Sequence, residues 1–324
     1  MPDRADTYAA ALLIDWFGGK TGRAYALASV GNPTPGARSG QGAASSAPTP
    51  VYLAQSDEGT LALAIAKLYE PESDPGAEDA RAFVEERLSA GLVRGPHMLW
   101  APPRAAVPAD EPEASDFAQR VQQAAAPLQP GQRGEVELPV AVQMAKMRDE
   151  GGYASVIGGL SRWWTLITER VNGTFHVNSS KMRRAPQSAA LREKLFDRIG
   201  ELSKPLQSGD AIEFDTIEAW TVQRLPREPL GETGFAIVQA PPRIDPADGT
   251  LMRRIVRKRL KDANAALACV DADIKGVGLI GIYEYAEHEN IGSFVKSLDP
   301  SLFAELGLVA AVVDGEVRPI FMPR

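Results

Sequence analysis

The chain has 324 residues, of which 44% are hydrophobic and 24% are charged, and its formal net charge is −7. These values are typical of a globular protein that can bury a substantial core, and the length allows about two domains. Cys269 is the only cysteine, so an intramolecular disulfide is excluded. The first residues lack the features of a signal peptide, and no apolar run approaches the ~18 residues of a membrane span. We therefore expect a cytoplasmic protein without a membrane partner.

Residues that could bind a metal or form a nucleophilic site are scarce. The three histidines, His97, His176 and His288, are far apart, and no H-x-H, H-x-x-x-H or C-x-x-C pair is present. That pattern argues against a structural zinc site, and one cysteine gives little support for a Cys-His nucleophile. We expect no resident metal or cofactor.

The stretch IDWFGGKTGR, Ile14–Arg23, contains a GKT triplet that is similar to the end of a phosphate-binding loop. Such a loop needs a first glycine five residues before the second, and that position is Ile14. Residues 8–17 have the apolar spacing of an amphipathic helix, so Gly18 and Gly19 are interpreted as its end. We expect no nucleotide-binding loop here.

The first part of the chain predicts short elements of both kinds. A segment rich in Gly, Ser, Ala and Pro at 32–50 is interpreted as a mobile loop. The apolar patterns that follow predict a strand at 51–54, helices at 61–69 and 77–90, a strand at 97–101, and a helix from Ser115 or Asp116 to 125.

The second part has clearer punctuation by Gly, Pro and Asx residues. Its patterns predict a strand at 135–145, a helix at 189–202, strands at 211–214, 219–225 and 235–239, a helix from Asp248 or Thr250 to 268, a strand at 276–283, a short helix from Asp299 to 307, and a hairpin of 308–313 with 317–321.

Residues 160–171 allow two interpretations. Leu160, Trp163, Trp164 and Ile167 have helical spacing, which favours a helix ending at Asn172-Gly173. The same Asn-Gly pair would also suit the turn of a hairpin. The two tryptophans have arginines on both sides and could stack on bases, although the helical spacing predicts that at least one belongs to the core.

These elements predict a mixed α/β (α+β) protein with an N-terminal α+β region at 1–130. A mixed sheet with flanking helices would follow at 131–324, with a nuclease-like order of elements at about 189–285 and the C-terminal hairpin.

Basic residues are concentrated in two segments although the whole chain is acidic. Residues 253–261 contain six Lys or Arg and no acid, and 162–204 contain nine against four. Close positive charges on one helix repel each other unless an anion lies opposite, which makes phosphate contact one interpretation of these segments. The alternative is a solvated helix face. The predicted contact residues are Arg253, Arg254, Arg257, Lys258, Lys261, Lys181, Arg183 and Arg184.

Two elements near the C-terminus carry a resemblance to a known family. A basic helix, Arg254–Leu267, leads into the apolar strand Gly276–Tyr283, and the helix ends in A-N-A-A-L. Together with a helix and three strands from Ala189 onward, this order resembles the core of the PD-(D/E)XK nuclease-like family, in which the basic helix often ends in A-x-x-Q-L. The resemblance implies a scaffold associated with nucleic acid.

The resemblance also implies a Mg²⁺ site, with an Asp on the second strand and an acid two residues before a Lys on the third. Asp215 or Glu218 could supply the first acid. On the third strand, Gln239 and Pro241 occupy the positions of the required acid and lysine. An amide and a proline cannot replace a carboxylate and an ammonium, so this site is incomplete.

Acidic residues and a lysine of the types that this Mg²⁺ site requires occur outside the second and third strands. Asp273 and Lys275 precede the last strand, and Glu193 on the preceding helix could be a further ligand. The candidate catalytic set is therefore Asp215, Glu218, Asp273 and Lys275. Mg²⁺ would be a cofactor only if these residues formed a rearranged site.

The sequence favours a nucleic-acid-associated, non-catalytic component of a bacterial multiprotein system that binds DNA or RNA and other proteins of that system. One alternative is a metal-dependent nuclease with a rearranged site. Another is a scaffold protein whose basic helix docks an acidic partner.

Overall fold

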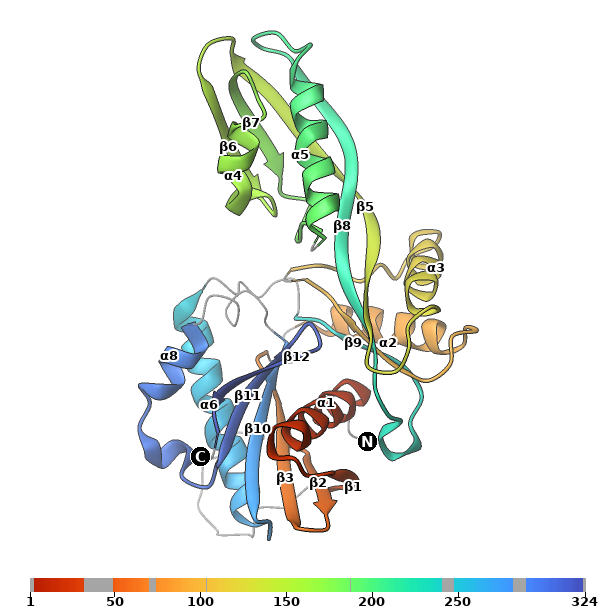
Figure 1. Ribbon diagram of the computed structural model, residues 1–324, viewed down its shortest axis with the longest axis vertical. Helices are drawn as coiled ribbons and strands as arrows, with labels where there is room; N and C mark the ends of the chain where they lie inside the picture. Colours follow the sequence, from red (N-terminus) through yellow and green to blue (C-terminus); the bar gives the residue numbers. More distant parts are fainter. Residues whose placement is uncertain are drawn as a thin grey trace.

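The computed structural model describes residues 3–31, 49–69, 74–102, 104–186, 188–240, 248–281 and 290–322. Within these ranges the chain has a mixed α/β fold built on two six-stranded mixed sheets (Figure 1). The predicted fold class is confirmed. The loop predicted at 32–50 lies almost entirely outside the described residues.

The first sheet is formed by the two ends of the chain. Its order is β1 (Ala26–Gly31), β2 (Val51–Ser56), β3 (Gly59–Lys67), β10 (Ile274–Ile280), β11 (Leu308–Val313) and β12 (Glu316–Phe321). Strands β1 to β3 are antiparallel, β10 lies parallel to both β3 and β11, and β12 closes a hairpin with β11. The partners β3 and β10 are separated in sequence by the whole second sheet.

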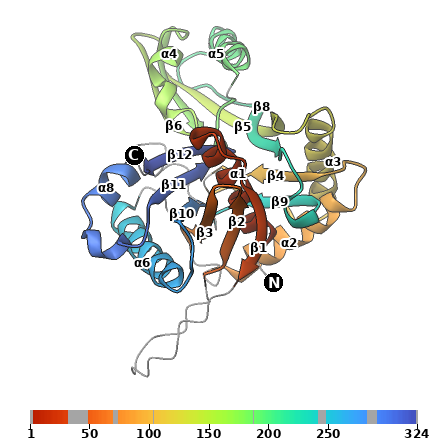
Figure 2. The same ribbon diagram turned by 60° about the horizontal axis from the view of Figure 1, so that its bottom comes forward.

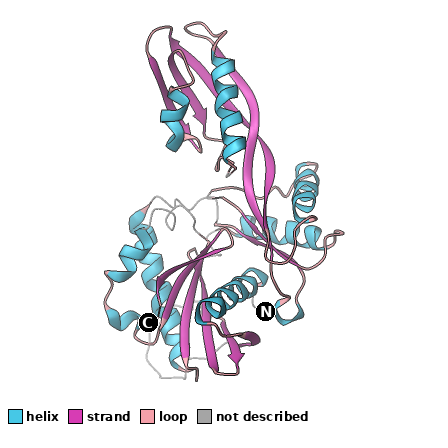
Figure 3. Ribbon diagram, viewed as in Figure 1, coloured by secondary structure: helices cyan, strands magenta, loops and turns pink. Residues whose placement is uncertain are grey.

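The second sheet has the order β6 (Gly152–Gly158), β7 (Gly173–Ser179), β5 (Arg133–Arg148), β8 (Ala211–Arg224), β4 (Pro96–Trp100) and β9 (Gly234–Val238). An antiparallel ladder joins β5 and β8 from Arg133 and Gln223 to Ala145 and Ala211. At one end of this ladder β4 pairs with β8, and at the other end β7 pairs with β5. The two long strands thus run from the body into a protruding part, residues 140–216, here called the arm (Figure 3).

The helices cover the sheets in a simple arrangement. Helix α1 (Arg4–Thr21) lies on one face of the first sheet, and α6 (Gly249–Ala268) and α8 (Asn290–Lys296) lie on the other (Figures 1 and 2). The second sheet carries α2 (Pro75–Ser89) and α3 (Glu113–Ala125) on the body, and α4 (Trp164–Thr168) and α5 (Ala189–Ser203) on the arm. None of the helices in the described ranges is long and apolar enough to cross a membrane.

Helix α1 is enclosed between the two sheets. Tyr8, Ala9 and Leu13 are completely buried, and the helix packs against β3, β10 and β11 on one side and β4 and β9 on the other. A helix that is apolar nearly all round is stable only in such an interior position. Strands β4 and β9 are accordingly buried on both faces: Met98 joins the core around α1, whereas Leu99 joins the core under α2 and α3.

Close approach of α1 to the first sheet depends on a strand position without a side chain. A Cβ atom at Gly278 would lie 2.9 Å from Cδ1 of Ile65 and 3.1 Å from Cδ2 of Leu13. Both distances are too short for ordinary van der Waals contact, so the absence of a side chain on β10 sets how deeply α1 can pack.

Several local predictions are confirmed by cap and turn geometry. Asp248 caps α6 by accepting hydrogen bonds from the backbone N–H groups of Thr250 and Leu251 at 3.0 and 3.1 Å. Asp314 and Gly315 form the β11–β12 turn with positive φ angles of 52° and 73°, as expected for an Asp-Gly hairpin turn.

The helix predicted at 61–69 is wrong, because residues 61–67 belong to β3. The segment is rich in Ala and Leu, which favour helices, but it is buried on both faces between β2 and β10. A short apolar run of this kind does not distinguish a buried strand from a buried helix.

The prediction for 160–171 is only partly confirmed. A 3-10 turn at Ser161–Trp163 leads into α4, which ends at Thr168, and β7 then begins at Gly173. The alternative hairpin is wrong, because β7 pairs with β6 in parallel orientation. The strands predicted at 211–214 and 219–225 are one continuous strand, β8.

The segment 189–285 is divided between the two sheets. Its first helix and strands, α5, β8 and β9, belong to the second sheet, whereas α6 and β10 belong to the first. The division at residue 130 likewise does not coincide with a boundary between sheets, since β4 and β5 lie in the same sheet on either side of it.

We predict that Leu13→Ala lowers the free energy of unfolding by about 2–5 kcal/mol, because it leaves a cavity beside Gly278. Urea unfolding followed by circular dichroism measures the change. Leu92 is 89% exposed, so Leu92→Ala is the matched control and should change stability by less than about 0.5 kcal/mol. Equal effects of the two substitutions would contradict the buried position of α1.

Candidate functional site

Helix α6 has one buried and one strongly basic side. Its buried stripe packs on the first sheet and consists of Met252, Ile255, Val256, Leu260, Ala263, Ala266 and Leu267. All five of the predicted phosphate contacts on this helix are exposed: Arg253, Arg254, Arg257, Lys258 and Lys261. The periodicity therefore places the two kinds of residue on different sides, as expected.

The cations on α6 differ in their surroundings. Arg253 lies over the ring of Phe294 on α8, with 5.9 Å between the guanidinium carbon and the ring centroid. No carboxylate of the described residues lies within ion-pair distance of Arg254, Arg257 or Lys261. Hydrogen bonds from Ser301 and, to a smaller extent, the charge of Arg257 lower the pKa of Asp299, so Arg257 does have a carboxylate nearby. All three cations are exposed to solvent and accessible to an anion.

Arg259 points inward and fixes the position of α6 along the sheet. It donates hydrogen bonds to the backbone oxygens of Lys67 at 2.9 Å and Tyr69 at 2.8 Å, where β3 ends. The half of α6 that precedes Arg259 therefore lies at the carboxyl ends of β3, β10 and β11. Figure 1 shows this half of the helix at the end of the first sheet nearest the arm.

The second basic segment, Lys181 to Arg184, lies at the base of the arm and is used largely for structure. Arg184 forms an ion pair with Asp314 in the β11–β12 turn. Arg183 donates from its side chain to the Ser180 oxygen at 2.7 Å, and Lys181 is exposed, 3.9 Å from Glu213. Because β11 ends at this turn, both predicted basic segments lie at the same end of the first sheet.

Asp215 and Glu218 do not form a metal site. They lie three residues apart on β8, so their side chains point to opposite faces. Asp215 is exposed. Glu218 is buried, and its oxygens accept hydrogen bonds from the backbone N–H of Arg183 and the indole N–H of Trp220. Burial raises the pKa of Glu218, and this carboxyl group holds the base of the arm against β8.

Asp273 and Lys275 lie at the opposite end of the first sheet, where β10 begins. Asp273 accepts hydrogen bonds from the backbone N–H of Thr60 at 2.7 Å and from its hydroxyl at 3.0 Å, and these bonds lower the Asp273 pKa. Lys275 pairs with Glu305 at 3.3 Å. The four candidate catalytic residues are therefore divided between two sheets and do not converge.

Two other residues considered for the nuclease-like site also make structural contacts. Glu193 pairs with Arg170 at 2.7 Å, and the buried Gln239 donates to the Ala105 oxygen at 2.7 Å. Pro241 lies outside the described residues. Within the described ranges, no group of three or more His, Cys, Asp or Glu side chains is arranged to hold a metal ion.

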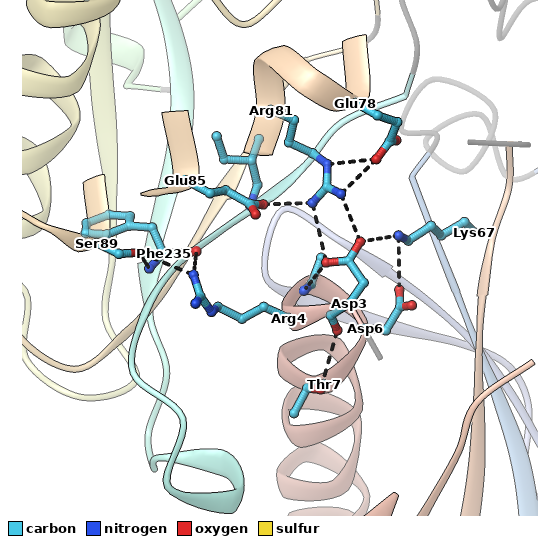
Figure 4. A network of polar contacts seen from close by, with 12 residues as sticks. Asp3, Arg4, Asp6, Thr7, Lys67, Glu78, Arg81, Glu85, Ser89 and Phe235 are labelled. Atoms are coloured by element: carbon cyan, nitrogen blue, oxygen red, sulfur yellow. Dashed lines mark hydrogen bonds and ion pairs between the residues drawn. The ribbon is translucent and has the colours of Figure 1, made fainter. Parts of the chain in front are cut away.

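A dense cluster of charged side chains lies at the N-terminus of α1 (Figure 4). Asp3 caps the helix, pairs with Lys67 at the end of β3, and pairs with Arg81 of α2 at 3.1 Å. Arg81 also binds Glu78 and Glu85, each at 2.8 Å. Buried charges of this kind are tolerated when each has a partner of opposite sign.

Strand β9 is tied to the same cluster through its backbone. Glu85 accepts a hydrogen bond from the N–H of Ile237 at 2.6 Å, and Arg4 donates to the oxygen of Phe235 at 2.8 Å. Figure 4 shows the side chains of α1, α2 and β3 converging on this point. The cluster thus joins the two sheets and is filled by its own ion pairs.

The pKa values of the two aspartates in the cluster are shifted in opposite directions. Burial acts to raise the pKa of Asp3, but the charges of Lys67 and Arg81 outweigh it and lower this pKa to about 2. Asp6 lies farther from Lys67, at 3.7 Å, and burial raises its pKa to about 7. One oxygen of Asp6 is buried without a hydrogen-bond partner. Near neutral pH, Asp6 is therefore partly protonated.

Sequence reasoning missed this cluster. Its members are far apart in the chain, and Asp3 and Lys67 alone are separated by 64 positions. The one local signal is Lys67 itself, a charged residue at the end of an otherwise apolar run that was interpreted as a helix.

Comparisons with known proteins provide no relative for this fold or for its basic helix. The chain matches no protein-family model, and neither the curated proteins nor the solved structures give a significant match.

We predict that Asp6→Asn stabilises the protein increasingly as the pH rises from about 4 to 7. The folded protein keeps a proton on Asp6 that the unfolded chain releases in this window, so wild-type stability falls there. The pKa shift of about three units, at ~1.4 kcal/mol per unit, makes the pH-dependent part of this difference roughly 4 kcal/mol above pH 7.

Urea unfolding at a series of pH values measures this difference. Asp57 is exposed in the turn between β2 and β3, so Asp57→Asn is the control and should give a difference that does not change with pH. A flat difference for Asp6→Asn as well would show that Asp6 is not buried as described.

Proposed function

We propose that the protein is a non-catalytic, nucleic-acid-binding component of a multiprotein system, and that it contacts phosphate through the exposed side of α6. The observation that carries this proposal is the set of solvated cations Arg254, Arg257 and Lys261 on one helix of an otherwise acidic chain. Such charges repel each other in the free protein, and the repulsion is relieved when phosphates bind.

The position of α6 supports the same proposal. The basic half of the helix extends along the carboxyl ends of β3 and β10, and Lys181 and Arg183 are exposed at the same end of the sheet. In sheets with parallel strands, ligands commonly bind outside these ends. A polyanion at this end could contact both basic segments.

We also propose a nuclease-like scaffold, formed by elements of the first sheet and not by the continuous segment 189–285. In the first sheet, α1, the antiparallel strands β1 to β3, α6 and the parallel strand β10 follow the order helix, three strands, helix, strand. This is the order that the PD-(D/E)XK resemblance requires. The arm and the second sheet then form an insertion between β3 and α6.

The residues of this core support a binding role without cleavage. The third strand ends in Lys67, but Ile65 lies two residues before it, where an acid is required, and β2 contains no acid. The ammonium of Lys67 is already paired with Asp3. The expected metal ligands are thus absent from both strands.

A cytoplasmic setting and other proteins as partners also belong to the proposal. The single exposed cysteine, Cys269, suits a reducing compartment. Because a non-catalytic binding component does not itself modify the nucleic acid, we propose that partner proteins of the same system carry out any reaction.

We predict that the triple variant Arg254→Glu, Arg257→Glu, Lys261→Glu loses at least tenfold in affinity for nucleic acid at low salt. For wild-type protein on duplex DNA, the logarithm of affinity should fall with log salt at about 0.9 per phosphate contacted, and the variant should show a smaller slope. Fluorescence anisotropy with labelled DNA or RNA over a salt series measures both quantities.

A dispersed variant separates a local contact from overall charge. Lys20, Arg120 and Lys194 are exposed on α1, α3 and α5, and reversing them to Glu changes the net charge equally. This control should bind almost normally. Equal losses in both variants would indicate a general charge effect, and no binding by wild-type protein would favour an acidic protein partner instead.

We also predict that the purified chain does not cleave single- or double-stranded DNA or RNA in Mg²⁺ or Mn²⁺, because the carboxylates in the described ranges do not converge on one site. A gel assay with each substrate measures cleavage. Activity that is lost in Asp215→Ala or Asp273→Ala would instead support the nuclease alternative.

A further inference from the structure

Exposed large hydrophobic side chains are concentrated on the arm. Among the described residues, eight large hydrophobic side chains are exposed, and four of them lie on the arm: Met147, Tyr153, Ile157 and Trp164. Single exposed apolar residues are common on any protein, but a local concentration of them indicates a surface that binds something.

Two of these side chains are aromatic and touch each other. Tyr153 on β6 is 50% exposed and Trp164 at the start of α4 is 47% exposed, and their ring centroids lie 6.1 Å apart with an interplanar angle of 57°. The neighbouring Trp163 instead packs near Phe196 in the arm core, at 6.0 Å. Of the two adjacent tryptophans, Trp163 therefore packs against the core, as the spacing predicts, and Trp164 is exposed to solvent.

Two exposed arginines lie near this aromatic pair: Arg162 two residues before Trp164 in the chain, and Arg148 on β5, two strands from Tyr153. Arg162 lies over the ring of Trp163, with 4.9 Å between the guanidinium carbon and the centroid. On the open face of the arm sheet, Tyr153 is the cross-strand neighbour of Thr174, which in turn pairs with Arg148. Arg162 and Arg148 are exposed, and no carboxylate of the described residues lies within ion-pair distance of either.

Several acids of the arm are already neutralised by ion pairs. Asp149 pairs with Lys146 at 3.0 Å, and Arg170 binds Asp197 at 3.1 Å. Residues 140–216 contain eleven Lys or Arg and nine Asp or Glu, a net charge of +2, whereas the whole chain carries −7. The arm is thus the more cationic part of an acidic protein.

We propose that Tyr153 and Trp164 form a stacking site for the unpaired bases of single-stranded nucleic acid, with Arg162 and Arg148 as its phosphate contacts. This inference rests on the proposed function and specifies its substrate class. Aromatic side chains bind bases of any sequence through their faces, and nearby cations hold the backbone. The bases of a duplex are stacked on each other and have no free face, so this site distinguishes single strands from duplexes.

The two contact surfaces have different tasks under this proposal. The cations of α6 contact phosphates of either form of nucleic acid, which gives affinity without discrimination. The aromatic pair adds affinity for unpaired bases alone. Removal of each surface should therefore have a different signature.

The experiment compares Tyr153→Ala/Trp164→Ala with wild-type protein on a labelled oligothymidylate of about 20 nucleotides and on a duplex of equal length. Fluorescence anisotropy gives both affinities. We expect single-strand affinity to fall about tenfold or more and duplex affinity to stay within about twofold. Both side chains are half exposed, so the variant should keep the wild-type thermal unfolding temperature.

Two control variants complete the design. Phe83 is 44% exposed on α2 of the body, and Phe83→Ala should leave both affinities unchanged. Tyr153→Phe/Trp164→Phe keeps two aromatic faces and should retain most of the single-strand affinity, which a role limited to the hydroxyl or indole N–H would not allow.

The outcomes separate this inference from the proposed function. If the alanine variant binds the single strand normally while the α6 reversal abolishes binding, the stacking site is wrong and the phosphate contact stands. Equal losses on single strand and duplex would also overturn stacking. Unchanged nucleic-acid binding together with an altered oligomeric state would assign the aromatic pair to a protein contact and overturn the proposal. If wild-type protein binds neither nucleic acid, both proposals fail.

Discussion

Helix α1 brings charged residues into the interior of the protein, and the two sheets are held together where those charges are neutralised. Asp3 caps the helix and meets Lys67 from the first sheet and Arg81 from the helix that covers the second. A buried ion that loses its partner is strongly destabilising, commonly by about 3–5 kcal/mol. The relative position of the sheets therefore depends on all three residues being present together.

The position of Lys67 in this cluster also helps to position the surfaces that we propose to bind nucleic acid. Lys67 ends β3, and the backbone oxygens of Lys67 and Tyr69 accept the hydrogen bonds of Arg259 that fix the position of α6. On the other side, the β11–β12 turn holds the base of the arm through the pair of Asp314 with Arg184. The basic helix and the arm are thus fixed to the same end of the first sheet by separate contacts.

The features that could be predicted from the sequence are those encoded by neighbouring residues. The cap at Asp248, the Asp314-Gly315 turn and the two sides of α6 each depend on a few consecutive positions or on a simple period. The catalytic candidates were grouped because they are close in sequence or match the letters of a motif, but Asp215 and Asp273 lie on different sheets.

Features that depend on distant residues were not predictable in the same way. The insertion of the second sheet between β3 and α6 means that paired residues of β3 and β10, such as Leu61 and Ile274, lie 213 positions apart in the chain, and no local pattern indicates such pairing. Lys67 is an example, because its role depends on the ion pair with Asp3, which is 64 positions away in the chain. The local pattern around Lys67 shows only a short apolar run, and such a run was interpreted as a helix.

We propose that nucleic acid lies against the basic half of α6 and against the aromatic pair of the arm. Photo-crosslinking of wild-type protein to a single strand containing bromouridine, followed by mass spectrometry of the crosslinked peptides, tests it most directly. We expect crosslinks within 249–261 and at Tyr153 or Trp164. Crosslinks confined to other surfaces, such as α2 and α3, would contradict it.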